Sequence, residues 1–139
     1  MISEAVRSVE IVLDRLIRQY TAGPPLDVLD CSCGIGTQAI ALAGRGYRVH
    51  ATDLSPAAVE RASQEAAGRG LPITFGVADM RALDGQVEGE FDLVLSCDNA
   101  LPHLLTDDDL RRALWAMRAR LRASGLLLIS IRDYDHLIM

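Results

Sequence analysis

The chain has 139 residues, of which half are apolar and 24% are charged; this composition fits one globular domain over residues 1–139 and excludes a fibrous or disordered protein. Its formal net charge of −5 and the absence of a Lys or Arg cluster argue against a nucleic-acid surface and favour a small-molecule partner. The longest apolar runs fall far short of the roughly 20 residues that a membrane span needs, and the acidic residues near the N-terminus do not fit a signal peptide, so we expect a cytoplasmic protein.

The first half of the chain alternates helical and strand-like patterns. Residues 3–20 carry apolar side chains at the spacing of one helix face, which predicts an amphipathic helix that a Gly-Pro-Pro segment ends. Residues 26–30 form a short apolar run that ends in an acid and predict a strand. Residues 37–43 are rich in Ala, Ile and Leu and predict a helix, which glycines end. Together they make one unit of strand, Gly-containing turn and helix.

The second half repeats this unit. Residues 47–52 predict a second strand, after which Ser55 and Pro56 supply the N-cap and first residue of a helix that runs to about residue 67. An irregular connection follows the third strand, and Thr106 then caps a helix that is apolar on one side. The other predicted strands cover residues 73–78, 91–97 and 126–131, and the apolar side of the last helix carries Leu110, Leu114, Met117 and Leu121.

Acids lie at the ends of all the predicted strands. Strands that alternate with helices and are almost wholly apolar predict a doubly wound α/β fold, with a mostly parallel sheet covered on both faces. In such a sheet the ligand binds beyond the carboxyl ends of the strands. The acids at this edge are Asp30, Asp53, Asp79, Asp98 and Asp133. One such acid is often only a helix cap, but five in register indicate a ligand site.

The three cysteines, Cys31, Cys33 and Cys97, cannot all be paired in disulfides, and no second Cys pair or His pair has the spacing of zinc ligands. Cys31 and Cys33 lie at the end of an apolar stretch, where small buried thiols are common. This position favours packing over redox chemistry or metal binding, so we expect reduced cysteines and no metal.

The turn after the first predicted strand contains Gly34 and Gly36, which let the backbone pass close to a ligand. Residues 34–39 fit the G-x-G-x-x-A form of a dinucleotide-binding turn, and Asp53, about 20 residues further on, would be the ribose acceptor. A nicotinamide-dependent oxidoreductase is therefore one interpretation. Asp30 argues against it, because a carboxylate that points at the ligand would repel a pyrophosphate. A cationic ligand without phosphate suits this position better.

Residues 28–37, with the sequence VLDCSCGIGT, resemble motif I of class I S-adenosylmethionine-dependent methyltransferases. The later motifs follow that family in order, so the resemblance covers essentially the whole chain. It implies a Rossmann-like core with five strands in the order 3-2-1-4-5 and S-adenosylmethionine as the cofactor, which would leave as S-adenosylhomocysteine. Ser32 is a departure, because the first glycine of the motif usually stands there.

The resemblance also implies which residues bind the cofactor. Asp53 would accept hydrogen bonds from both ribose hydroxyls, and Leu54 would lie beside the adenine. Asp79 would contact the adenine amino group, Met80 would contact a ring nitrogen through its backbone, and the carbonyl of Cys97 would face the ligand's ammonium group. The full implied set, in which the turn holds the methionine part, is Asp30, Ser32, Gly34, Gly36, Asp53, Leu54, Asp79, Met80 and Cys97.

Residues 97–104 and 131–134 look most like small-molecule methyltransferases similar to glycine and sarcosine N-methyltransferases. The implied reaction transfers a methyl group to a small acceptor, an amine, by an in-line displacement in which the protein supplies alignment and no nucleophile. No catalytic residue is assigned; the candidates that could orient an acceptor are Asn99, His103, Arg132 and Tyr134. Arg132 could hold a carboxylate or only pair with nearby aspartates. We interpret His50 and His136 as structural, and Trp115 as a helix-packing residue rather than a substrate platform.

Members of this class continue past the fifth strand with two more strands, so the chain looks like a shortened member. Residues 126–131 would then be an apolar edge strand, and we expect a homodimer contact there. The leading interpretation is a methyltransferase that acts on a small amine. The alternatives are a cofactor-binding module without catalysis and a nicotinamide-dependent oxidoreductase.

Overall fold

The structure is a computed structural model that describes residues 4–97 and 106–129, with residues 4–10 described by their backbone alone. Its strands are all parallel and form one sheet in the order β3-β2-β1-β4-β5. They are β1 (Asp27–Asp30), β2 (Arg48–Asp53), β3 (Thr74–Val77), β4 (Phe91–Ser96) and β5 (Leu121–Ile129). The predicted fold class and strand order are confirmed.

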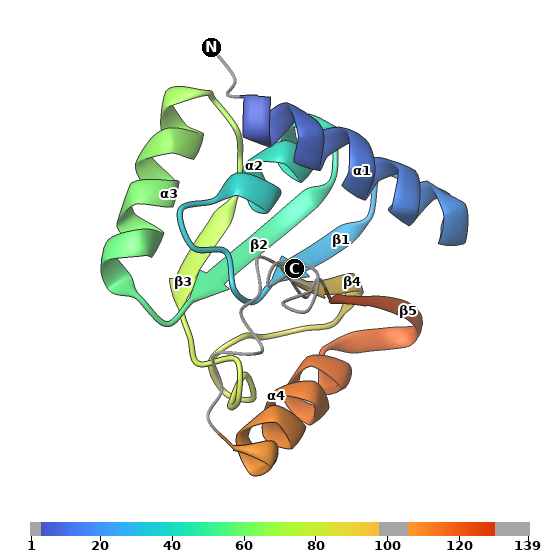
Figure 1. The fold of residues 1–139 in the computed structure, drawn as a ribbon, viewed down its shortest axis with the longest axis vertical. Coiled ribbons are helices and arrows are strands. Elements are labelled where there is room, and N and C mark those ends of the chain that lie inside the picture. Colours follow the sequence, from blue (N-terminus) through green and yellow to red (C-terminus); the bar gives the residue numbers. More distant parts are fainter. Residues whose placement is uncertain (1–3, 98–105, 130–139) are drawn as a thin grey trace, which may run out of the picture.

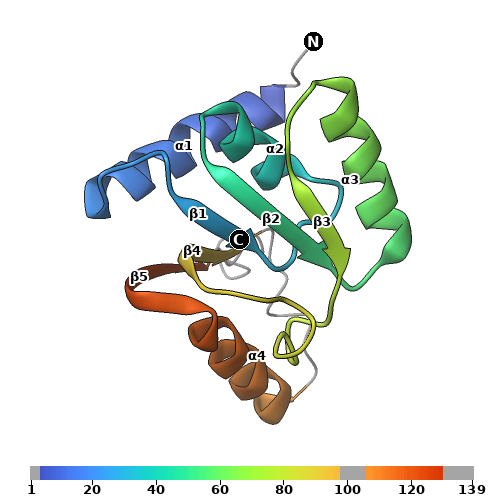
Figure 2. The ribbon, with the colours of Figure 1, turned by 180° about the vertical axis from the view of Figure 1, so that it is seen from behind.

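Helices cover both faces of the sheet, as Figures 1 and 2 show. One face is covered by α1 (Glu4–Tyr20), α2 (Thr37–Gly44) and α3 (Pro56–Gly68), and the other by α4 (Asp107–Ala119). The core therefore has two layers. Leu13, Ile17 and Leu42 pack with the sheet on the first face, whereas Leu29, Leu83 and Met117 pack on the second. None of the helices in the described ranges is long and apolar enough to cross a membrane.

The local signals for helix starts act as the sequence predicts. The side-chain oxygen of Ser55 accepts a hydrogen bond from the Ala58 N–H at 3.2 Å, and Pro56 follows as the first helical residue of α3. The Thr106 hydroxyl accepts one from the Asp109 N–H at 3.0 Å at the start of α4. Between β3 and β4, residues 78–90 are irregular, as expected, and Leu83 and Val87 of this segment cover the second face of the sheet.

The boundary between α4 and β5 lies earlier than predicted. The helix ends at Ala119 because the Phe91 N–H binds the Arg120 carbonyl at 2.7 Å and Leu121 pairs with Phe91, which draws the chain into the sheet. A bulge then precedes the apolar run at which the sequence places the strand. The buried residues of α4 are Ala113 and Met117, while Leu110 is exposed. Trp115 does not pack in the core: its side chain is 61% exposed and lies beside the Arg118 guanidinium.

β5 forms one end of the described sheet, where its apolar residues from Leu126 to Ile129 are only partly buried. This agrees with an apolar edge strand. The homodimer contact expected at this edge stays a prediction.

A buried polar cluster joins α1 to the turn between α2 and β2. Asp14 is buried, with a residue exposure of 7%, and its carboxylate accepts hydrogen bonds from the Tyr47 hydroxyl and from Arg18 Nε, both at 2.9 Å. The Arg45 guanidinium lies 3.5 Å from the same carboxylate. Burial raises the pKa of Asp14, but the hydrogen bonds from Tyr47 and Arg18 outweigh burial and leave that pKa lowered. Burial, together with the nearby Asp14 charge, raises the pKa of Tyr47 to about 12.

Tyr47→Phe is expected to lower the free energy of unfolding by about 1–3 kcal/mol at neutral pH, because it removes a buried hydrogen bond to a charged group. A lowered folded-state pKa means that the stabilisation from the Asp14 charge is fully present above the ordinary aspartate pKa of 3.8 and is lost as the pH falls through the folded pKa. The difference in the free energy of unfolding between the wild type and Tyr47→Phe should therefore become smaller in acid. Urea unfolding at neutral and acid pH measures it, with Tyr20→Phe, at a 68% exposed tyrosine, as the control. A pH-independent gap would contradict the assignment.

Candidate functional site

The carboxyl end of β1 leads into a turn that the Asp30 side chain organises. Asp30 is fully buried, and its Oδ1 accepts a hydrogen bond from the Ser32 N–H at 3.2 Å. The Ser32 hydroxyl lies 2.9 Å from the Ser96 hydroxyl at the end of β4. The serine that replaces the expected glycine thus has a side-chain partner, and this bond joins the turn to β4. Ser96 was not singled out in the sequence, although it is the one polar residue in the last part of an apolar strand.

The glycine turn packs against β2. The Cys33 N–H binds the Thr52 carbonyl at 2.9 Å, and the Gly36 N–H binds the Cys33 carbonyl at 2.8 Å. Gly34 and Gly36 both have a positive φ, of 52° and 97°. A Cβ on Gly36 would lie 3.1 Å from the Ala62 Cβ, so a side chain would crowd α3, whereas a Cβ on Gly34 would meet no atom within 4 Å. The backbone at Gly34 therefore borders open space.

Asp53 ends β2 beside this turn. Its Oδ1 accepts a hydrogen bond from the Gly34 N–H at 3.1 Å, and its Oδ2 accepts one from the Ser55 N–H at 3.0 Å. The carboxylate thus fixes the glycine turn and the start of α3 at once. A carboxylate has about four lone-pair positions, so two remain for hydroxyl donors from outside the protein. The structure brings together Asp30, Ser32, Gly34, Gly36 and Asp53.

Three exposed apolar residues lie near Asp53 in the chain, in the sheet or in the glycine turn. Leu54, the next residue, is 64% exposed, and Ile35, next to Gly34, is 49% exposed. Val77, which pairs with Asp53 in the sheet, is 51% exposed. Exposed apolar side chains gathered at one edge are suited to a flat, weakly polar ring. Ile35 and Val77 were not predicted as site residues.

Asp79 and Met80 follow β3. Met80 is buried among the residues of the second core layer. The Asp79 carboxylate binds Arg81, whose Nη2 donates to Oδ2 at 2.7 Å and whose backbone N–H donates to Oδ1 at 2.9 Å. The Arg81 side chain holds the pKa of Asp79 below its ordinary value. Arg81 also reaches Asp109 of α4, and no signal in the sequence singled out Arg81.

The remaining predicted residues fall at or beyond the end of the described segment. Cys97 is buried and is the last described residue after β4. Asn99, His103, Arg132 and Tyr134 lie outside the described residues, so their role in orienting an acceptor stays a prediction. Within residues 4–97 and 106–129, no group of three or more His, Cys, Asp or Glu is arranged to hold a metal ion.

The thiols near the turn are buried. Cys31 lies 2% exposed in the second core layer and donates to the Leu95 carbonyl at 3.5 Å, while Cys33 lies 3% exposed in the first. Burial, reinforced by the Asp30 charge, raises the pKa of Cys31 and raises that of Cys33 to about 12. Both thiols therefore stay protonated at neutral pH, which agrees with the packing role that the sequence favours.

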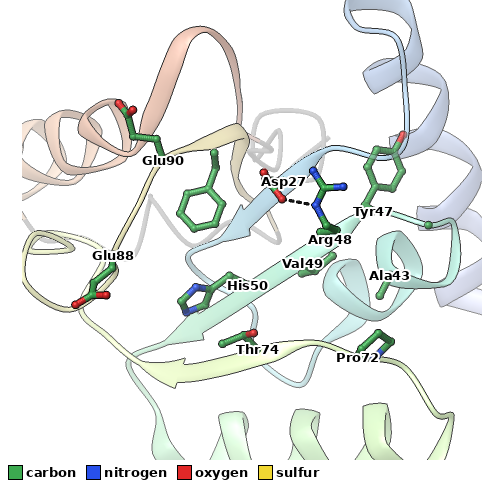
Figure 3. A pocket seen from close by; sticks show the side chains of 12 residues that line it. Asp27, Ala43, Tyr47, Arg48, Val49, His50, Pro72, Thr74, Glu88 and Glu90 are labelled. Carbon is green, nitrogen blue, oxygen red and sulfur yellow. Dashed lines mark hydrogen bonds and ion pairs between the residues drawn. The ribbon is translucent and has the colours of Figure 1, made fainter.

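A hollow of about 670 Å³ opens at the other end of the sheet, at the amino ends of the strands, as Figure 3 shows. An ion pair between Asp27 and Arg48, at 2.6 Å, lies on one side of it. His50 faces Phe91 with a ring-centroid distance of 5.9 Å, and burial lowers the pKa of His50. None of the predicted cofactor residues lines this hollow, whereas His50 does. The packing of His50 on Phe91 agrees with the structural role that the sequence favours.

Comparisons with known proteins identify the family. A model described as a methyltransferase domain matches residues 28–125. A glycine/sarcosine N-methyltransferase of Parasynechococcus marenigrum is 35% identical over 124 residues, which cover 89% of this chain and 43% of that protein. A glycine/sarcosine/dimethylglycine N-methyltransferase of Actinopolyspora halophila is 32% identical over 112 residues, 80% of this chain and 20% of that protein. This chain thus spans less than half the length of either curated relative.

Solved structures agree. An amino pentose methyltransferase from Micromonospora echinaspora, solved with S-adenosylmethionine bound, superposes with a TM-score of 0.80 at 27% identity, over 94% of this chain and 52% of that one. The similarity to class I methyltransferases inferred from the sequence is confirmed, and the nicotinamide-dependent alternative gains no support. Because the family model matches most of the chain, including the glycine turn, Asp53 and Asp79, this chain belongs to the methyltransferase domain family.

Proposed function

We propose that this chain binds S-adenosylmethionine at the carboxyl ends of β1, β2 and β3 and forms part of an enzyme that methylates a small amine. The observation that carries the proposal is the Asp53 carboxylate, which Gly34 and Ser55 hold in place beside open space at the Gly34 backbone. The predicted cofactor set, with Asp30, Ser32, Gly36, Leu54, Asp79, Met80 and Cys97 around it, lies at the carboxyl ends of the strands, where an open parallel sheet binds its ligand.

The residues of this edge fit that cofactor in three ways. Asp53 keeps lone pairs for two ribose hydroxyls after it has accepted its two backbone hydrogen bonds. Ile35, Leu54 and Val77 offer exposed apolar surface to an adenine ring. The buried Asp30 carboxylate favours a cationic ligand over a pyrophosphate, because opposite charges attract more strongly at low dielectric.

Bound S-adenosylmethionine supplies a methyl group that its positive sulfur has already activated. The chain itself then has to bind and orient the cofactor and exclude water from the site. Asp53 would orient the ribose, and the backbone at Gly34 would pass close to the methionine part. No side chain has to act as a nucleophile, which agrees with thiols at Cys31 and Cys33 that are buried and protonated.

The proposal of an amine acceptor is supported by the two relatives described above, which are N-methyltransferases of glycine and its methylated forms. Asn99, His103, Arg132 and Tyr134 remain the candidates for orienting that acceptor. An amino acid acceptor would give Arg132 a carboxylate to bind through its planar guanidinium.

Two measurements test the proposal. Calorimetric titration with S-adenosylmethionine, S-adenosylhomocysteine and NAD should give micromolar binding of the first two alone. Transfer of a labelled methyl group to glycine and sarcosine should then exceed transfer to glycolate, which has a hydroxyl in place of the amine. Binding without transfer to any amine would support a cofactor-binding module instead, and absence of binding to both sulfur ligands would contradict the proposed site.

A further inference from the structure

Arg81 uses its whole guanidinium group to join two parts of the chain. Its Nη2 donates to Asp79 Oδ2 at 2.7 Å, and its Nε lies 3.1 and 3.2 Å from the two Asp79 oxygens. Its Nη1 lies 3.2 Å from Asp109 Oδ1 in the first turn of α4. Every guanidinium nitrogen therefore faces a carboxylate. The side chains of Arg81, Asp79 and Asp109 are 32%, 26% and 20% exposed, so water screens these pairs only in part.

Both ends of this bridge are themselves held. The Arg81 N–H donates to Asp79 Oδ1 at 2.9 Å, which closes a tight turn, and the Asp79 N–H donates to the Gln86 side chain at 3.2 Å. At the other end, the Thr106 hydroxyl accepts from the Asp109 N–H. The Asp79 carboxylate consequently has one orientation, set by Arg81 from the side of α4.

This arrangement limits what Asp79 can bind next. Arg81 supplies three donors to a carboxylate that has about four lone-pair positions, which leaves about one position for a donor from outside. A single position with a fixed direction selects a ligand that presents an N–H group there. It disfavours a ligand that presents a carbonyl oxygen, because two acceptors repel and the half-buried Asp79 carboxylate is left without a donor at that position.

We propose that Arg81 is a positioning residue that fixes the Asp79 carboxylate and thereby sets the preference of the cofactor site for a purine with an amino group at position 6 over one with a carbonyl group there. The inference rests on the proposed function, because it assumes that the adenine end of the cofactor reaches Asp79. It adds a role for a residue that itself does not touch the cofactor.

The test compares the binding of S-adenosylhomocysteine and S-inosylhomocysteine; the second has a carbonyl group in place of the amino group at position 6 and a hydrogen on the adjacent ring nitrogen N1. Because the N1 change is the same for every variant, the effect of Arg81 is measured by how the ratio of the two affinities changes between variants. The wild-type chain should prefer the adenine compound by about tenfold or more. In Arg81→Met this ratio should fall several-fold, because Asp79 loses its orientation. Arg81→Lys keeps the positive charge and the backbone hydrogen bond but lacks the planar fork, so its ratio should lie in between. Arg112→Ala is the control, because Arg112 lies 3.7 Å from the same Asp109 oxygen and its change leaves the Arg81–Asp79 contacts in place, so it should keep the wild-type ratio.

A loss of fold would lower the affinity for both compounds alike, whereas a loss of positioning changes their ratio. If Arg81→Met has a lower melting temperature than the wild type, the affinity ratio of Arg81→Lys is used to test the inference instead. A wild-type ratio in a folded Arg81 variant would overturn the inference, and so would an equal fall in Arg112→Ala. Failure of the wild-type chain to bind S-adenosylhomocysteine would instead overturn the proposed function.

Discussion

Asp53→Ala is expected to weaken the binding of S-adenosylhomocysteine by about 10- to 100-fold. The substitution removes the acceptors for two ribose hydroxyls, at about 1–3 kcal/mol in total. It also frees the Gly34 and Ser55 N–H groups, which the carboxylate holds at 3.1 and 3.0 Å, so the glycine turn loses the anchor that sets its distance from β2. Both effects act on the same ligand. Calorimetric titration measures the change.

The control for Asp53→Ala is Asp84→Ala, which removes the same charge from a side chain that is 95% exposed. The affinity of Asp84→Ala for S-adenosylhomocysteine should match that of the wild type. That result would exclude a general effect of net charge on binding. Thermal unfolding of both variants separates a lost contact from a lost fold. Unchanged affinity in a folded Asp53→Ala protein would refute the ribose assignment, whatever the outcome for the acceptor.

The second large effect is expected at Gly36. Gly36→Ala should lower the free energy of unfolding by about 2–4 kcal/mol, since it combines a left-handed backbone with overpacking. The new Cβ would lie 3.1 Å from both the Ala62 Cβ and the Ile40 Cδ1, and φ is 97°. Neither neighbour can move easily, because Ala62 is fully buried in α3 and Ile40 is buried in α2. Urea unfolding measures the loss.

Gly34→Ala is the matched control. Gly34 also has a left-handed backbone, but its φ of 52° suits an L-residue better, and its Cβ would enter open space. We expect a stability loss of about 1 kcal/mol. The added methyl group should instead weaken the binding of S-adenosylhomocysteine, because it fills the space at the turn. Equal destabilisation of the two variants, with no effect of Gly34→Ala on binding, would contradict this division of roles.

Much of the fold follows from local patterns in the sequence. Apolar runs and acids at the strand ends predict all five strands, and Ser55 and Thr106 predict two helix starts that their side chains do cap. The predicted end of α4 was wrong, because the position of this end depends on a non-local contact. The Phe91 N–H binds the Arg120 carbonyl and draws Leu121 into the sheet. The spacing of apolar residues along a helix contains no information about that contact. The same limit applies to α1, where Val12 and Leu16 follow the apolar spacing but lie 57% and 36% exposed.

The residues of the candidate site likewise include some that local patterns predict and some that depend on non-local contacts. Gly34, Gly36 and Asp53 could be predicted because the glycines lie in one short motif and Asp53 follows the next strand. Ser96 could not be predicted, because its partner lies 64 residues away in the chain. Arg81 could not be predicted as a bridge, because one of the two carboxylates that it joins, Asp109 of α4, lies across the fold. Polar pairs of this kind leave no periodic signal in the chain.

The hydroxyl pair of Ser32 and Ser96 has a consequence for how this site can change during evolution. A relative with glycine at the position of Ser32 lacks the partner that a buried hydroxyl at the position of Ser96 requires. The two positions are therefore expected to covary among relatives: a serine at the first should accompany a hydroxyl at the second, and a glycine at the first should accompany a small apolar residue at the second. Loss of Ser32 alone leaves the buried Ser96 hydroxyl unpaired, so a change at the position of Ser32 is expected to follow or accompany one at the position of Ser96.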